Sequence, residues 1–136
     1  IGILPIPEGI RRTREFMESV RTRSRQGHCI VVYPEAHVWP YYTSIRPFPA
    51  TSFRFPVEED APSFAMTTTY QKRRFGRRPK VTVFLDGPFF PAEGLTSRKE
   101  KQEDLCRQIH DCMIRRSTQS NCQYIHYEVS TPLSSK

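Results

Sequence analysis

Hydrophobic residues follow two different spacings along this chain, and these spacings predict helices and strands in alternation. From Gly9 to Gln26, apolar residues recur at near-helical intervals while arginines occupy the opposite face, which predicts an amphipathic helix that ends at Gly27. The apolar positions of this helix are Ile10, Phe16, Met17 and Val20. The next residues, His28–Tyr33, form an apolar run rich in β-branched side chains, which is typical of a strand covered on both faces.

Two further strands and a turn are predicted in the second half of the chain. Phe64–Gln71 is rich in threonine and aromatic residues. Lys80–Asp86 carries aliphatic residues at alternate positions, Val81, Val83 and Leu85. The basic segment Lys72–Pro79 would join these strands as antiparallel neighbours. Short strands are also expected at Ile1–Ile6 and Tyr124–Val129.

A second helix is predicted from Ser97 to about Arg116, because Ser97 and Glu100 match a capping box. Its buried stripe would consist of Leu105, Ile109, Cys112 and Met113. The order of elements predicts an α/β fold, in which a mixed β-sheet is covered by helices and the first strand, helix and strand form a crossover unit. Residues 1–117 would belong to one domain, and residues 118–136 would be a C-terminal extension with a short strand and a frayed tail. The chain starts inside a predicted strand and not with Met, so we expect the domain to be N-terminally incomplete.

A long irregular segment separates the two halves of this pattern. Residues 34–62 contain six prolines, which neither a helix nor a central strand tolerates well. The segment also carries aromatic residues, which argue against disorder: Trp39, Tyr41, Tyr42, Phe48, Phe53 and Phe55. Long loops in compact domains are usually functional, so we expect a site here.

Charge adds possible partners to this picture. The 136 residues include 21 Lys and Arg against 14 Asp and Glu, a formal charge of +7, and the 37% of hydrophobic residues exclude a disordered polar tail. The cations concentrate at residues 11–25 and 72–80, where they would attract nucleic acid, anionic lipid or a phosphorylated substrate.

No apolar run approaches the ~20 residues that a membrane span needs. No signal peptide is recognisable at the start of the chain.

The four cysteines form no C-x-x-C pair, and we expect free thiols in a reducing compartment. Cys106 and His110 lie four residues apart on the second predicted helix and could reach one metal ion. Cys112, however, points to a different helix face from Cys106. Buried or incidental thiols explain these residues better, and no metal site is expected.

The segment from the first helix to His37 carries the most specific motif. A glycine follows the helix, an apolar run follows the glycine, and Tyr33-Pro34-Glu35 ends the run. In this arrangement the chain resembles the glycerolipid acyltransferase family, which includes 1-acylglycerol-3-phosphate acyltransferases and whose third conserved block reads helix–Gly–apolar strand–F-P-E-G-T-R. Pro62–Met66 and Val81–Pro88 are similar to two later segments of the family. The resemblance extends over about residues 1–113.

This resemblance implies a substrate-binding site in the loop after the apolar run. Its residues would be Pro34, Glu35, Ala36, His37 and Arg46. Val38 stands where the family has an arginine that holds the acceptor phosphate, and Arg46 is the candidate substitute. Arg46 could instead be a surface arginine stacked on Tyr41 or Phe48.

The other loop residues also have alternative roles. The Glu35 carboxylate would accept backbone N–H bonds or orient the acceptor. His37 would donate to a phosphate or a thioester carbonyl, or bond to the loop backbone. Trp39, Tyr41 and Tyr42 would lie at a membrane interface, line an acyl groove, or pack within the loop.

The family's catalytic motif, H-x-x-x-x-D, is absent from this chain. None of its histidines is followed by an aspartate five residues later: His28, His37, His110 and His126. We therefore expect no catalytic residue in this chain and place the catalytic block upstream of Ile1.

The resemblance then implies a fragment of an enzyme that transfers a fatty acyl group from acyl-CoA or acyl-carrier protein to a (lyso)glycerophosphate-type hydroxyl in phospholipid synthesis. We expect the chain alone to be inactive and to bind no cofactor. Its partners would be the acyl thioester donor, a phosphorylated glycerolipid acceptor and an anionic membrane surface. The enzyme would be cytoplasmic and peripheral to the inner face of the membrane.

Two alternatives remain open. The chain could be a nucleic-acid-binding module that uses Arg73, Arg74, Arg77 and Arg78, although it has no RNA-binding signature and we do not expect a nucleic-acid partner. It could also be an acyltransferase-like domain without catalytic activity that binds lipid or a partner protein.

Overall fold

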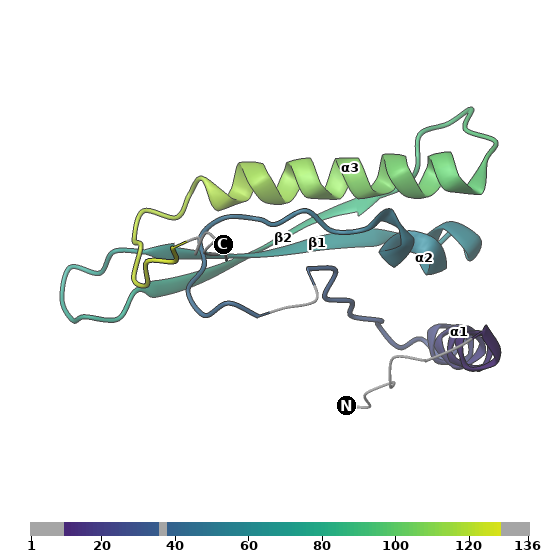
Figure 1. Cartoon of the computed structure of the whole chain (residues 1–136), viewed down its shortest axis with the longest axis horizontal. Helices are drawn as coiled ribbons and strands as arrows, with labels where there is room; N and C mark the ends of the chain where they lie inside the picture. Colours follow the sequence, from purple (N-terminus) through teal and green to yellow (C-terminus); the bar gives the residue numbers. More distant parts are fainter. Residues whose placement is uncertain (1–9, 36–37, 129–136) are drawn as a thin grey trace, which may run out of the picture.

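A computed structural model of the chain describes residues 10–35 and 38–128. It is a small mixed α/β structure with one two-stranded antiparallel sheet. The elements in chain order are α1 (Ile10–Arg25), the 3₁₀ helix η1 (Ala50–Phe53), α2 (Arg54–Glu58), β1 (Ser63–Gln71), β2 (Lys80–Phe89) and α3 (Arg98–Ser117). Helix α3 lies lengthwise along the hairpin, and α1 and α2 lie near one end of it (Figure 1).

The two strands form the predicted antiparallel hairpin. Their register pairs Gln71 with Lys80 next to the turn and Met66 with Leu85 further along. The ladder shifts between Ser63 and Ala65, a bulge opposite the end of β2. Both strand predictions are therefore confirmed, with β2 three residues longer than expected.

One face of the hairpin packs on α3. On β1 the inward residues Ala65, Thr67 and Thr69 are buried, and their small side chains allow the helix to come close. Leu105 and Ile109 of α3 complete a core with Phe53 of η1. The apolar residues between these positions face the other way: Phe64, Met66, Val81, Val83 and Leu85 are all exposed. The sheet is thus covered on one face, whereas the sequence predicted cover on both.

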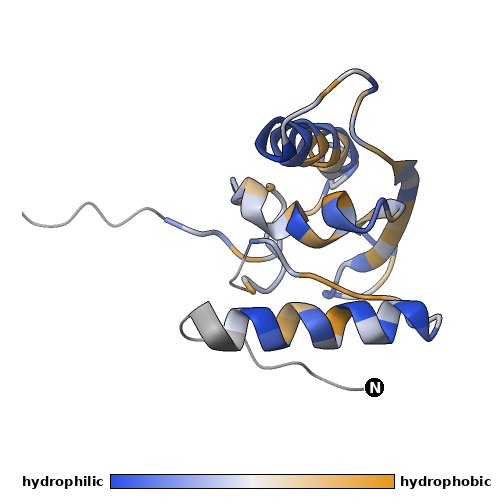
Figure 2. Ribbon diagram, turned by 90° about the vertical axis from the view of Figure 1, so that its right-hand side faces the viewer, coloured by the Kyte–Doolittle hydropathy of each residue, from blue (hydrophilic) through white to orange (hydrophobic). Residues whose placement is uncertain are grey.

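Helix α1 agrees with the predicted amphipathic helix. Met17 and Val20 are buried and Phe16 is half-buried, and the helix shows alternating polar and apolar bands (Figure 2). Its end is a Schellman motif, in which the Gly27 N–H donates to the Ser24 carbonyl and the His28 N–H to the Arg23 carbonyl. This motif needs a left-handed residue, which Gly27 provides at φ +81°.

Helix α3 also agrees with the sequence. It begins with the predicted capping box at Ser97, whose backbone N–H donates to a Glu100 carboxylate oxygen at 3.3 Å. Leu105, Ile109 and Cys112 are buried and Met113 is half-buried. The burial of Asp104 on the same helix was not predicted.

The predicted strand His28–Tyr33 is wrong. These residues form an irregular segment, in which Val31 is 63% and Tyr33 74% exposed. A β-branched run has strand propensity, but a strand also needs a neighbour that satisfies its backbone N–H and C=O groups. In the part of the chain that the structure describes, neither β1 nor β2 pairs with this segment. The predicted crossover unit is therefore not formed by the described residues.

The terminal strands have different outcomes. Residues 124–128 are irregular, so no strand forms in the described part of Tyr124–Val129. The chain after α3 instead crosses the end of β1, where the Asn121 N–H donates to the Tyr70 carbonyl. The predicted strand Ile1–Ile6 lies outside the described residues.

Candidate functional site: the loop at residues 34–48

The loop brings together two of the predicted site residues, Glu35 and Arg46. The Arg46 backbone N–H donates to the Glu35 carboxylate at 3.1 Å. In return, the Arg46 guanidinium donates to the Glu35 backbone carbonyl at 3.1 Å. Each residue thus binds the main chain of the other, and the pair closes the loop across eleven positions. The carboxylate of Glu35 has the backbone-binding role that was one of its two predicted alternatives.

Arg46 also lies on an aromatic ring. Its guanidinium carbon is 4.9 Å from the centroid of the Trp39 ring, within the range of a cation–π contact. The sequence predicted a stacking partner in the same loop but suggested Tyr41 or Phe48. Phe48 packs instead against Phe53, with ring centroids 5.9 Å apart.

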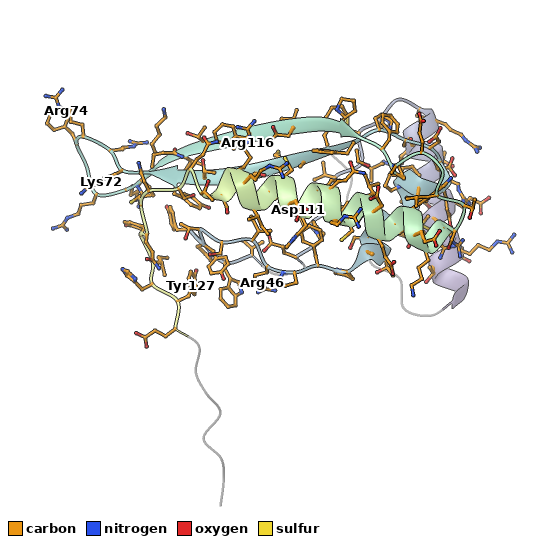
Figure 3. The ribbon with its side chains drawn as sticks, turned by 90° about the horizontal axis from the view of Figure 1, so that it is seen from above. Arg46, Lys72, Arg74, Asp111, Arg116 and Tyr127 are labelled. Atoms are coloured by element: carbon orange, nitrogen blue, oxygen red, sulfur yellow. The ribbon has the colours of Figure 1, made fainter. Side chains whose placement is uncertain are left out.

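Trp39 belongs to a cluster of three rings, one of which is Tyr127 from the chain after α3. Its centroid is 5.2 Å from that of Tyr42 and 4.9 Å from that of Tyr127. The Tyr127 hydroxyl donates to the Pro40 carbonyl at 2.7 Å, and Figure 3 shows Tyr127 beside Arg46. The residue is 87 positions away from Pro40, so no local pattern predicts this contact. Residues 124–128 therefore help to build the loop, a role that the sequence did not suggest.

Among the described residues, no acidic side chain forms an ion pair with the Arg46 guanidinium. Within residues 10–35 and 38–128, its only hydrogen-bond acceptor is the uncharged Glu35 carbonyl. A half-buried, always protonated guanidinium of this kind can bind a phosphate or carboxylate through its remaining N–H groups. Pro34 is half-buried beside Glu35, and the predicted residues Ala36 and His37 lie outside the described residues.

The thiols near the core are structural. Burial raises the pKa of the Cys106 thiol, which contacts the Phe48 carbonyl at 3.7 Å. Burial and the Asp86 carboxylate raise the pKa of the Cys112 thiol. A raised pKa suppresses the thiolate form, so neither cysteine is suited to act as a nucleophile. Cys106 and His110 have no third ligand among the described residues, where no group of three metal-binding side chains occurs.

Asp86 and Arg116 join β2 to α3. The Arg116 Nε donates to an Asp86 oxygen at 2.9 Å, and a second guanidinium nitrogen reaches the other oxygen at 2.5 Å. This two-point hydrogen bond holds the pKa of the Asp86 carboxyl below its ordinary value. The same guanidinium lies 4.5 Å from the Phe84 centroid. Arg116 directs both of these donors to a partner within the fold, which indicates a structural role.

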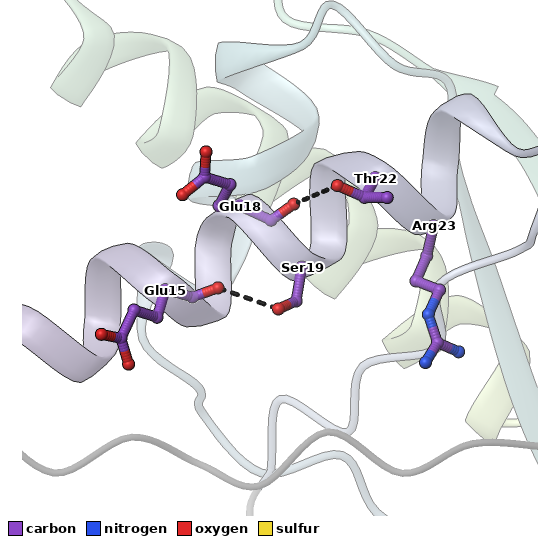
Figure 4. Close-up of a pocket in the computed structure, with 5 residues that line it drawn as sticks. All are labelled: Glu15, Glu18, Ser19, Thr22 and Arg23. Atoms are coloured by element: carbon purple, nitrogen blue, oxygen red, sulfur yellow. Dashed lines mark hydrogen bonds between the residues drawn. The ribbon is translucent and has the colours of Figure 1, made fainter.

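A shallow pocket on α1 offers no converging chemistry. It is lined by Glu15, Glu18, Ser19, Thr22 and Arg23 (Figure 4). The Ser19 and Thr22 hydroxyls each donate to a carbonyl one helical turn earlier, at 2.9 Å. The loop at residues 34–48 remains the better candidate site.

Comparison of the chain with family models, curated proteins and solved structures gave no match. Among the described residues, no helix combines the length and apolar character needed to cross a bilayer.

Proposed function

We propose that this chain is part of an acyltransferase and that its loop at residues 34–48 holds the phosphate of a glycerophosphate-type acceptor. The observation that carries this proposal is the reciprocal contact of Glu35 and Arg46, in which the guanidinium binds a backbone carbonyl and, among the described residues, no carboxylate. The Tyr33-Pro34-Glu35 motif supports the same family. The acyl donor would be a CoA or carrier-protein thioester.

In this proposal Arg46 is the acceptor-binding residue and Glu35 is a positioning residue. Stacking on Trp39 and bonding to the Glu35 carbonyl restrict the long Arg46 side chain before any substrate binds. A restricted side chain loses less conformational entropy when a phosphate binds, which favours affinity. Two prolines, at positions 47 and 49, stiffen the backbone beyond Arg46.

The chemical step needs a general base that this chain is not proposed to supply. The base would take the proton of the acceptor hydroxyl. The hydroxyl oxygen would attack the thioester carbonyl carbon and form an ester bond. The carbon–sulfur bond would then break, and the released thiolate would take up a proton. We assign the base to an H-x-x-x-x-D block in the parent protein, upstream of Ile1.

The experiment compares binding and turnover in the parent protein, the present chain together with its natural upstream sequence. Arg46→Ala is expected to raise KM for a glycerophosphate acceptor about 10- to 100-fold and to leave kcat within about threefold, because a charge-assisted hydrogen bond contributes about 1.5–3 kcal/mol. Arg115→Ala is the matched control, since Arg115 is an exposed arginine on α3. It should leave both constants unchanged.

Three results would overturn this proposal. The first is an upstream sequence without the H-x-x-x-x-D block. The second is the absence of acyl transfer by the parent protein, which would favour a lipid-binding domain without catalytic activity. The third is an equal effect of Arg46→Ala and Arg115→Ala on KM, which would remove the special role of the loop.

A further inference from the structure

The turn between the two strands concentrates more positive charge than any other described loop. We call residues 72–80 the basic tip. Its six cations are all exposed: Lys72, Arg73, Arg74, Arg77, Arg78 and Lys80. The segment contains no acidic residue, and the end of the hairpin with Lys72 and Arg74 extends away from the rest of the structure (Figure 3).

These cations are not neutralised within the described residues, where every ion pair lies elsewhere in the fold. Six like charges within nine residues repel one another, so a surface that supplies anions is the complementary partner. One aromatic residue, Phe75, is also part of the basic tip and is 80% exposed. Its centroid is 5.5 Å from the Arg74 guanidinium carbon.

An apolar surface continues from the basic tip along the strands. We call it the open face, because it is the side of the hairpin that α3 does not cover. Its exposed large apolar residues are Phe64, Met66, Val81, Val83 and Leu85, each between 51% and 69% exposed. Strand alternation places these residues on one side, and Val81 follows the basic tip directly. The basic tip therefore lies at one end of the open face.

We propose that the basic tip and the open face together dock this protein on an anionic bilayer. The cations would bind lipid phosphates and other anionic headgroup oxygens, and Phe75 with the open face would enter the boundary between headgroups and acyl chains. This proposal deepens the proposed function by naming the surface at which it would act. Membrane binding can be measured without acyl transfer, so either proposal can fail while the other stands.

The chemistry of the open face favours a bilayer over a nucleic acid. β-Sheets that bind single-stranded nucleic acid stack its bases on aromatic side chains. Four of the five exposed apolar residues have no aromatic ring for stacking, and Tyr70 on the same side already packs against Tyr41, whereas all five can bury apolar area in lipid. A second copy of the chain is a poorer partner, because each copy carries the same positive tip.

The test uses flotation of the protein with two kinds of vesicle, phosphatidylcholine alone and phosphatidylcholine mixed with phosphatidylglycerol. Binding is expected only to the mixed vesicles and should weaken with added salt. Each cation near an anionic surface contributes about 1 kcal/mol, so Arg73→Ala/Arg74→Ala should lower the partition coefficient about 30-fold. The matched control is Arg14→Ala/Arg23→Ala, which removes the same charge from exposed positions of α1. Its effect should be below about threefold.

A second pair of variants separates membrane insertion from base stacking. Phe75→Leu keeps an apolar side chain and should retain vesicle binding, whereas Phe75→Ala should weaken it about tenfold or more. An oligoribonucleotide is measured in parallel. Docking on the bilayer is overturned if both double variants lose binding equally, or if both vesicles are bound alike. It is also overturned if the protein binds RNA but not vesicles, or forms a dimer that Leu85→Lys abolishes.

Discussion

Asp104 is a carboxylate that joins a loop to a helix from a buried position. It is 6% exposed and accepts the Ala92 backbone N–H at 2.9 Å and the Gln108 side chain at 2.7 Å. The Arg107 guanidinium is a third donor. Gln108 also donates to the Phe90 carbonyl at 3.0 Å, so the side chains of Asp104 and Gln108 together hold the loop at residues 90–97 to α3.

Asp104→Ala should lower the free energy of unfolding by about 2 kcal/mol, because it leaves the Ala92 N–H without its acceptor and removes two further bonds to a charged group. Asp111→Ala is the control, since Asp111 is exposed on the same helix (Figure 3). It should change the free energy by less than about 0.5 kcal/mol. Urea unfolding followed by far-UV circular dichroism measures both, and equal losses would contradict the role of Asp104.

At the scale of residues, the sequence predicted which residues lie in the candidate site better than it predicted which residues they contact. Glu35 and Arg46 were both assigned to the site, and the structure places them in contact. The ring beneath Arg46 was expected within the loop, but Trp39 was not singled out for it. Tyr127 was missed because a contact across 87 positions leaves no local pattern. Whether the site binds phosphate stays a prediction.

Among the elements, the hairpin depends on a glycine near the end of β2. Gly87 has φ +135°, and an added Cβ would lie 2.8 Å from the Ser63 carbonyl oxygen and 2.9 Å from the Phe64 ring. Gly76 in the basic tip also has a positive φ, +97°, but open space surrounds its Cβ position. A comparison of the two glycines separates the free-energy cost of a side chain at positive φ from the free-energy cost of a steric clash.

Gly87→Ala is expected to lower the free energy of unfolding by at least about 2 kcal/mol, since backbone strain and a steric clash add. Gly76→Ala should cost about 1 kcal/mol, because only the strain applies. Thermal and urea unfolding of the two variants measure the difference. If Gly76→Ala were the more damaging change, the close approach of β1 to Gly87 would not matter for stability.

The elements also show why one strand prediction failed while others were confirmed. α1 and α3 have local end signals, Gly27 and the capping box, and a helix satisfies most of its own backbone hydrogen bonds. β1 and β2 are joined by a short turn and pair with each other. His28–Tyr33 has strand propensity of the same kind but pairs with neither strand in the described structure. Whether this segment forms a strand depends on residues that are distant in the sequence, and a local pattern does not show them.

Across the whole molecule, Glu58 links three helices. It is at the end of α2, and its carboxylate binds Arg21 of α1 at 2.9 Å, Arg54 of α2 at 2.8 Å and Arg98 of α3 at 2.9 Å. Burial by itself would raise the pKa of this carboxyl. The hydrogen bond from Arg54 and the charges of the three arginines outweigh burial and hold the pKa below its ordinary value of 4.5.

Asp86 and Asp104 shift in the same direction. The Arg116 hydrogen bond lowers the pKa of Asp86, and the Ala92 N–H lowers that of Asp104, both from an ordinary value of 3.8. For all three carboxyls, the unfolded chain therefore binds protons at a higher pH than the folded chain. Their contribution to stability is complete above the unfolded pKa values and is lost as the pH falls through the lower, folded ones.

The free energy of unfolding should accordingly be nearly constant from about pH 7 to about pH 5 and should fall steadily below about pH 4.5. Urea titrations at a series of pH values measure this profile. Glu58→Gln removes one of the three carboxyls, so its profile should lie lower at neutral pH and fall less steeply in acid. Glu103→Gln is the control, since the one ion pair of Glu103 among the described residues is an exposed pair with Lys99 at 3.7 Å, and it should leave the profile unchanged. A stability that rose as the pH fell toward 4 would contradict the sign of all three shifts, because it would mean that the folded state takes up protons more readily than the unfolded chain.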